Sequence, residues 1–209
     1  DIRSAPLRLG ISVALVPDYL PNLGEVLEAF RQQYPGIPLK LASLSNDEVS
    51  VQLQRGALDA GLVMDLGGCA TELARTALSQ HTAAVMVCRS SPFWERTHLT
   101  PAELDGQTLL VPGFAPDALA PLWQALQASG AHPQLELGEQ FYQVLYRTQE
   151  QNCISLNRLE GAPGGLMHNA KNIVLDGLPP ICAGFLRPQK QHNACVELLC
   201  RFLQERLKF

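Results

Sequence analysis

The apolar residues between Pro21 and Tyr34 recur at steps of three and four, which is the period of one face of an amphipathic helix. Pro21 suits the first turn of such a helix, because the N–H that proline lacks has no partner there. Pro35 disfavours the helical conformation at Tyr34, and Gly36 readily takes a left-handed one. The pattern therefore predicts a helix over these residues with a sharp end.

Strands and helices alternate through the first part of the chain. Strands are expected at 7–12, 39–44 and 58–63, and helices at 21–34 and 46–55. Ser45 or Asn46 can accept hydrogen bonds from the free N–H groups of the second helix, which Gly56 ends. This βαβαβ order predicts a mostly parallel sheet covered by helices, with ligands outside the carboxyl ends of the strands.

A second set of elements begins near residue 81. Strands are expected at 81–89, 108–111, 135–137, 153–156 and 181–186, and helices after Thr100 and at 117–129, 140–147 and 192–207. Thr100, Pro101 and Glu103 have the order of a cap, a first-turn proline and a capping-box acid. Gly130 is expected to close the helix at 117–129. The chain is therefore expected to be an α/β protein, with the last helix packed on a sheet.

The composition is that of a globular protein, with 46% hydrophobic and 17% charged residues. The formal net charge is −4 and the Lys and Arg residues are scattered, so this part of the protein has no basic surface for nucleic acid. No apolar run is long enough to span a bilayer, and residues 1–6 lack the layout of a signal peptide. We therefore expect a cytoplasmic protein without a membrane partner, and a sequence that begins inside a longer chain or after processing.

The six cysteines have no metal-binding or paired spacing. They are Cys69, Cys88, Cys153, Cys182, Cys195 and Cys200, without a C-x-x-C pair or a histidine at zinc-finger spacing. Cys88 and Cys182 lie in apolar, strand-like runs, where a thiol acts as a small hydrophobe. We expect reduced, structural thiols; a redox switch at Cys69 or Cys153 is the less favoured alternative.

No catalytic motif stands out, so we expect no enzyme activity, metal or cofactor. Gly67-Gly68 and Gly164-Gly165 are too isolated for phosphate loops and are expected to be turns. Of the five histidines, His168 is the strongest catalytic candidate, because it closes the glycine-rich loop at 160–168. A surface position is the favoured interpretation even there.

Three segments precede helices and are candidates for ligand contact. They are the loop at 12–17, Asn46, and the loop at 112–116 that leads to Asp117. Free N–H groups at helix starts favour an anion or a polar oxygen. The alternative is that Asn46 and Asp117 only cap their own helices.

Several short segments keep a particular order and spacing along the first half of the chain. They are Leu7–Ile11, Leu20-Pro21, Phe30–Gly36, Gly56–Val63, Val85–Cys88 with Ser91–Phe93, and Leu99–Gly106. Together they resemble the regulatory, effector-binding domain of LysR-type transcriptional regulators. The resemblance rests on their order and spacing rather than on any one motif.

The resemblance implies two Rossmann-like subdomains joined by two crossover strands, as in periplasmic binding proteins of type 2. Residues 1–87 with 185–209 would form the first subdomain and residues 88–184 the second, with a winged helix-turn-helix domain before Asp1. A small-molecule effector would bind in the cleft between the subdomains. It would change how a homodimer, or a tetramer of the full-length protein, holds DNA and controls transcription. The helices at 21–34 and 117–129 would form the dimer interface.

The resemblance also implies a set of ligand-binding residues. They are Ser12, Val13, Ala14, Leu15, Asn46, Met64 and Asp65 in the first subdomain, and Gly113, Phe114, Ala115 and Phe141 in the second. Ala14 and Met64 stand where well-known members have a serine and a basic residue, which favours a neutral or apolar effector over a dicarboxylate. The segment 151–158 replaces a glycine-rich segment ending in Leu-Pro, so the distal wall of the cleft differs. The alternative function is a periplasmic solute-binding protein of a transporter, which an export signal would distinguish.

Overall fold

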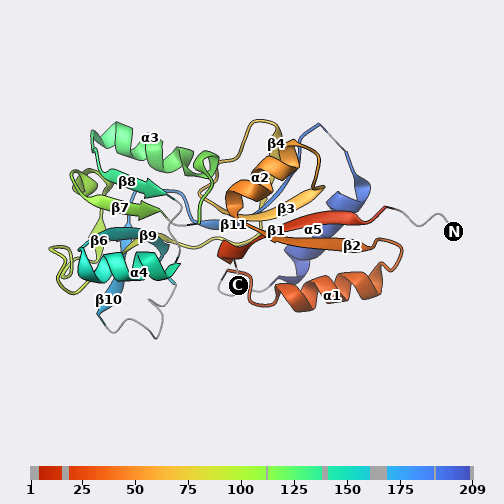
Figure 1. Cartoon of the computed structure of the whole chain (residues 1–209), viewed down its shortest axis with the longest axis horizontal. Helices are drawn as coiled ribbons and strands as arrows, with labels where there is room; N and C mark the ends of the chain where they lie inside the picture. The colour runs from red at the N-terminus through yellow and green to blue at the C-terminus, as the bar shows by residue number, and fades with distance from the viewer. Residues whose placement is uncertain are drawn as a thin grey trace. The chain divides into compact units, whose positions relative to one another are not determined.

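In a computed structural model the chain divides into two compact units, each built around one sheet (Figure 1). Unit 1 holds the residues up to Asp65, Cys69–Gln80 and those from Cys182 onward; unit 2 holds Leu66–Gly68 and His81–Ile181. The structure describes residues 5–15, 19–111, 113–137, 141–160, 169–190 and 192–207, without the side chains of residues 141, 142 and 145. The subdomain boundaries expected at 87/88 and 184/185 stay predictions.

The sheet of unit 1 has a parallel centre and an antiparallel edge. Its strands are β1 (Leu7–Ser12), β2 (Leu39–Leu44), β3 (Ala60–Asp65), β4 (Leu73–Ala77) and β11 (Cys182–Pro188), in the order β2-β1-β3-β11-β4. β2, β1 and β3 run parallel, whereas β11 is antiparallel to both β3 and β4. The predicted parallel βαβαβ arrangement is confirmed for the first three strands.

Helices cover both faces of this sheet. They are α1 (Leu23–Gln33), α2 (Asn46–Gln54) and α5 (Ala194–Arg206), with a 3-10 turn at Val13–Leu15. Figure 1 shows α1 and α2 on opposite sides of the sheet. Phe30 of α1 packs edge-on against Phe202 of α5, with 5.3 Å between ring centroids.

Two glycines allow α2 to lie close to the sheet. Gly10 of β1 and Gly61 of β3 are partners in the register of the two strands. A Cβ at Gly61 would overlap the side chain of Val49 on α2, and a Cβ at Gly10 would lie 2.5 Å from Leu58. The pair therefore makes a flat patch on which α2 rests.

The sheet of unit 2 is mixed, with parallel pairs at both ends and the antiparallel strand β5 between them. Its strands are β5 (Ala83–Cys88), β6 (His98–Leu99), β7 (Thr108–Val111), β8 (Gln134–Leu137), β9 (Ile154–Arg158) and β10 (Ala170–Leu175), in the order β6-β10-β5-β9-β7-β8. β9, β7 and β8 are parallel, and β5 is antiparallel to both of its neighbours. The helices are α3 (Ala120–Ser129) and α4 (Phe141–Glu150), with 3-10 turns at Pro101–Leu104 and Pro116–Leu119.

Most of the predicted elements are confirmed, and some need correction. The helix predicted from Asp117 begins as a 3-10 turn, and the one after Thr100 is 3-10 throughout. Gly130 ends α3 with a φ of 71°, as predicted. The strands β4, β6 and β10 were not predicted, because these short edge or mixed segments lack a clear apolar alternation. Gly164-Gly165 and His168 lie outside the described residues.

Among the described residues, no helix has the length and apolar character needed to cross a membrane.

Candidate functional site

The predicted ligand-binding residues of unit 1 meet at one edge of its sheet. Ser12 ends β1, Asn46 begins α2 directly after β2, and Met64 and Asp65 end β3. Because these strands are adjacent and parallel, their carboxyl ends lie at the same edge. The structure thus brings the predicted unit 1 residues, Ser12–Leu15, Asn46 and Met64-Asp65, to one edge of the sheet, although they are far apart in the sequence.

The Asn46 side chain links α2 to β3. Its Nδ2 donates to the carbonyl oxygen of Met64 at 2.6 Å, and its Oδ1 accepts from the Met64 N–H at 3.1 Å. Asn46 is only 3% exposed, so this amide satisfies backbone groups that water cannot reach. Both polar atoms of the Asn46 side chain are therefore used in hydrogen bonds within unit 1.

Ser45, not Asn46, caps α2. The Oγ of Ser45 accepts from the Glu48 N–H at 3.2 Å, and the Glu48 carboxylate accepts from the Ser45 N–H at 2.8 Å. This hydrogen bond from the Ser45 backbone lowers the pKa of Glu48. With Asp47 beside Glu48, the first turn of α2 carries two carboxylates at the positive end of the helix.

The turn after β1 exposes one apolar side chain. Ser12 is fully buried and its Oγ accepts from the Ala14 N–H at 3.2 Å. Leu15 is also fully buried, whereas Val13 is 61% exposed. Val13 is thus the accessible side chain of this turn.

Asp65 and Arg75 form a buried ion pair at the end of β3. The Oδ1 of Asp65 lies 2.7 Å from Nε and 2.6 Å from Nη2 of Arg75, which stands on β4. Asp65 is fully buried, and it faces Cys182 across the β3–β11 register. Burial raises the pKa of the Cys182 thiol, and the charge of Asp65 adds to this effect. A Cβ at Gly184 of β11 would overlap the Asp65 carboxylate, so the pair needs glycine there.

In unit 2 the predicted residues follow β7. Gly113 has a φ of 77°, and Phe114 and Ala115 are 7% and 5% exposed. The carbonyl of Ala115 accepts from the Ala118 N–H at 3.0 Å, which closes the 3-10 turn. Phe141 begins α4, and its side chain lies outside the described residues.

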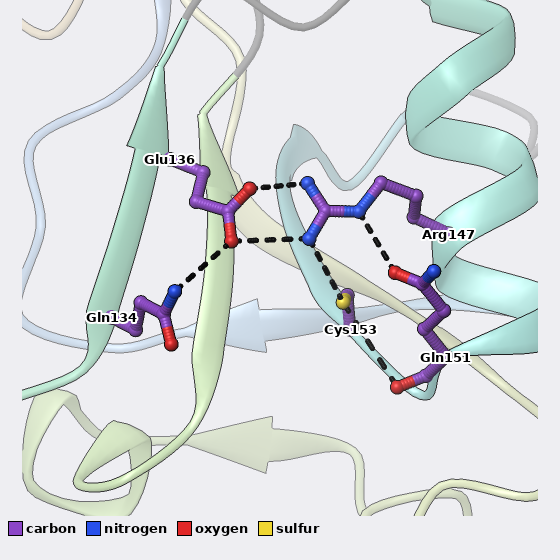
Figure 2. Close-up of polar contacts among 5 residues, drawn as sticks. All are labelled: Gln134, Glu136, Arg147, Gln151 and Cys153. Carbon is purple, nitrogen blue, oxygen red and sulfur yellow. Dashed lines mark hydrogen bonds and ion pairs between the residues drawn. The ribbon is translucent and has the colours of Figure 1, made fainter.

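A polar cluster around Arg147 joins α4 to the edge strand β8 (Figure 2). Both Nη atoms of Arg147 contact the Glu136 carboxylate, with 3.1 Å from Nη2 to Oε1, and its Nε donates to Gln151 at 3.0 Å. The hydrogen bond from Arg147 lowers the pKa of Glu136. The Sγ of Cys153 lies 3.9 Å from Nη2. The cluster was not predicted, because a strand residue and a helix residue eleven positions apart share no periodic signal.

None of the six cysteines, all of which the structure describes, forms a disulfide. Cys153 is 6% exposed, and half-buried Cys69 lies 3.5 Å from the carbonyl of Leu73. These positions do not test whether Cys69 or Cys153 is a redox switch, so the switch stays a prediction. Among the described residues no group of three His, Cys, Asp or Glu side chains is arranged to hold a metal ion.

His81 lies where the chain enters unit 2. Its backbone N–H and C=O pair with those of Ile181, the last residue of the unit, at 2.8 Å each. Its Nδ1 is 3.9 Å from Oε2 of Glu160. Burial and the charge of Arg158 lower the pKa of His81, against the opposing effect of Glu160. The imidazole is therefore held in its neutral form.

Comparison with protein families identifies the chain. Residues 3–140 match the LysR substrate binding domain. The chain belongs to this family. The resemblance seen in the sequence is confirmed, and membership favours the regulator over the transport-protein alternative.

Solved structures of LysR-family proteins share the fold over nearly the whole chain. HinK from Pseudomonas aeruginosa is 13% identical, with a TM-score of 0.70 over 99% of this chain and 72% of its own. The CcmR regulatory domain of Synechocystis, solved with 2-PG, is 15% identical, with a TM-score of 0.68 over 98% of both chains. The BenM effector-binding domain with benzoate is 18% identical, with a TM-score of 0.65 over 96% of this chain and 90% of its own. No curated protein sequence matches the chain.

The fold class is thereby confirmed as α/β of the periplasmic-binding-protein-like kind, with two sheets.

Proposed function

We propose that this LysR-family chain senses a small effector with the residues gathered at the carboxyl edge of the unit 1 sheet. The observation that carries the proposal is the convergence of Ser12–Leu15, Asn46 and Met64-Asp65 on that edge. Parallel α/β sheets bind ligands outside the carboxyl ends of their strands. Gly113–Ala115, which follow β7 in unit 2, are proposed to contact the same ligand, together with Phe141.

The proposed output is a change of state rather than a chemical reaction. An effector that binds one arrangement of the protein better than another shifts the population toward it. In a full-length regulator, that shift would alter how an N-terminal winged helix-turn-helix domain holds DNA. Benzoate is the effector bound in the BenM structure, and 2-PG is bound in the CcmR structure.

We also propose a cytoplasmic homodimer, and a tetramer of the full-length protein. The helices α1 and α3 are the proposed interface. Trp123 of α3 is 44% exposed, and aromatic side chains are enriched where protein surfaces associate. A monomer at all concentrations in sedimentation equilibrium would contradict this part of the proposal.

Paired surface substitutions test the binding site. The probes are a panel of benzoic acid, benzamide, benzylamine and their ring-substituted and aliphatic homologues, screened by the rise in Tm that a ligand of the folded state causes. Val13→Lys is expected to weaken the binding of the best probe by about tenfold, because it places a charged side chain at the accessible turn. Leu41→Lys is the matched control, since Leu41 is 50% exposed on β2 and outside the proposed site.

Equal effects of the two substitutions would show that Val13 does not contact the ligand. A panel without any binder would contradict the proposed function itself.

A further inference from the structure

The loops that follow the parallel strands carry no basic residue. Segments 9–30, 41–54, 56–74 and 97–146 contain neither Lys nor Arg. These segments include the carboxyl ends of β1, β2, β3, β7 and β8. Every predicted ligand-binding residue also lies within them. A negatively charged ligand would therefore find no side-chain cation on these loops.

Acidic side chains do stand at the helix starts beside the predicted site. Asp47 and Glu48 occupy the first turn of α2, and Asp117 the first turn of the 3-10 helix at Pro116–Leu119. Asp47 and Asp117 are exposed. In α2 the positive end of the helix is already matched by the chain's own carboxylates and by the Ser45 cap. Asp47 and Glu48 repel an anion that approaches the carboxyl edge of the unit 1 sheet.

The arginines nearest these strand ends are engaged by the protein. Arg75 holds the fully buried carboxylate of Asp65, and Arg147 holds Glu136. Drawing either guanidinium toward a ligand would leave a carboxylate without its ion pair. Arg158, half-buried at the end of β9, lies near His81 and Glu160 in unit 2.

The polar side chains of the predicted site in unit 1 are likewise committed to internal bonds. The Asn46 amide is held by both backbone groups of Met64, and the charge of Asp65 is balanced by Arg75. The exposed side chain of the set is Val13. An apolar ligand surface matches Val13, and an anion finds no side-chain partner in this lining that offsets its desolvation.

We infer that the effector is a small molecule with an apolar body and no negative charge. The inference rests on the proposed function and names the ligand class of that same site. The inferred class differs from benzoate, the carboxylate effector of BenM.

The probe panel decides the class, because each skeleton occurs as an acid, an amide and an amine. Binding of the amides or amines, with the matching acids at least about tenfold weaker, is the expected result. Preferred binding of the acids would overturn the inferred ligand class and leave the proposed function standing. Binding of no compound would overturn the proposed function, and the inference with it.

Charge variants give a second, independent measurement. The double variant Asp47→Asn/Asp117→Asn is expected to strengthen binding of the matching acid by roughly threefold to tenfold and to leave the amide unchanged. Glu25→Gln/Glu95→Gln removes two exposed carboxylates elsewhere and is expected to change neither. Arg158→Gln is expected to leave the amide unchanged; loss of acid binding in this variant would identify Arg158 as an anion site and overturn the inference.

Discussion

Two arginine–carboxylate pairs, one in each unit, differ in how deeply they are buried. In unit 1, Asp65 is fully buried and the side chain of Arg75 is 19% exposed. In unit 2, the side chains of Glu136 and Arg147 are 28% and 21% exposed. The first pair joins strands inside a sheet, whereas the second joins an edge strand to a helix at the surface (Figure 2).

The comparison shows that the same pair of groups has two different structural roles. A fully buried carboxylate depends on its partner, because water cannot replace the guanidinium. A pair that water reaches loses much less when one member is removed. The contrast predicts a graded series of responses to substitution.

Arg75→Met is expected to have the largest effect, a loss of about 3–5 kcal/mol in the free energy of unfolding. The substitution leaves Asp65 charged, buried and without its ion pair. Urea denaturation followed by circular dichroism measures the loss. The double variant Asp65→Asn/Arg75→Met is expected to recover part of it; equal stability of the single and double variants would show that the buried charge is not the cause.

Asn46→Ala is expected to cost about 2 kcal/mol, because the buried N–H and C=O of Met64 lose their partner. The same denaturation measurement applies. Asp47→Ala is the neighbouring control and is expected to change stability by less than about 1 kcal/mol, since Asp47 is exposed. Similar losses in both variants would assign the effect to the helix start rather than to the Asn46–Met64 link.

Acidification is expected to reduce stability through His81. Its pKa in the folded protein lies below the ordinary value of 6.5, so the unfolded chain binds the proton more readily. The contribution is complete above about pH 6.5 and is lost as the pH falls from there toward the lowered pKa, with a slope of at most about 1.4 kcal/mol per pH unit. Unfolding curves between pH 7.5 and 5 measure the slope, and His81→Gln is expected to flatten it. An unchanged slope in that variant would assign the pH dependence to other groups.

Glu136→Gln is expected to cost much less stability than Arg75→Met, because the pair with Arg147 is partly hydrated and the amide keeps one hydrogen bond. Chemical denaturation of the variant gives the value. A loss as large as that of Arg75→Met would remove the distinction between the two pairs.

Arg31→Gln is expected to have the smallest effect, within about 0.5 kcal/mol of zero. Arg31 and Glu28 pair on α1 with side chains 64% and 51% exposed. Thermal unfolding of the variant provides the baseline for the series. A larger loss would show that α1 is supported by this surface pair.

Much of the fold follows from local patterns in the sequence. The helical period before Tyr34, the Pro35-Gly36 stop and Gly130 each predicted an element or its end that the structure confirms. These signals are local, because a helix face or a terminator is set by neighbouring residues. The edge strand β4 and the inner strand β10 were missed, because their strand character comes from pairing with neighbouring strands that are distant in the sequence.

The sequence predicted which residues lie at the candidate site, but it did not predict which hydrogen bonds and ion pairs they form. The order of strands and helices, together with the family resemblance, located Asn46 and Asp65 beside the carboxyl ends of parallel strands. Sequence alone left open whether Asn46 caps α2, and the structure assigns that role to Ser45.

The sequence by itself determined the alternation of helices and strands, the family, and the absence of Lys and Arg from the loops beside the predicted site. The tertiary structure alone decided which charges are engaged. Arg75 meets Asp65 because β4 joins the sheet beside β11, and Gly184 leaves room for the carboxylate between them. Such contacts depend on strand order and register, which bring distant residues together and leave no periodic trace in the chain.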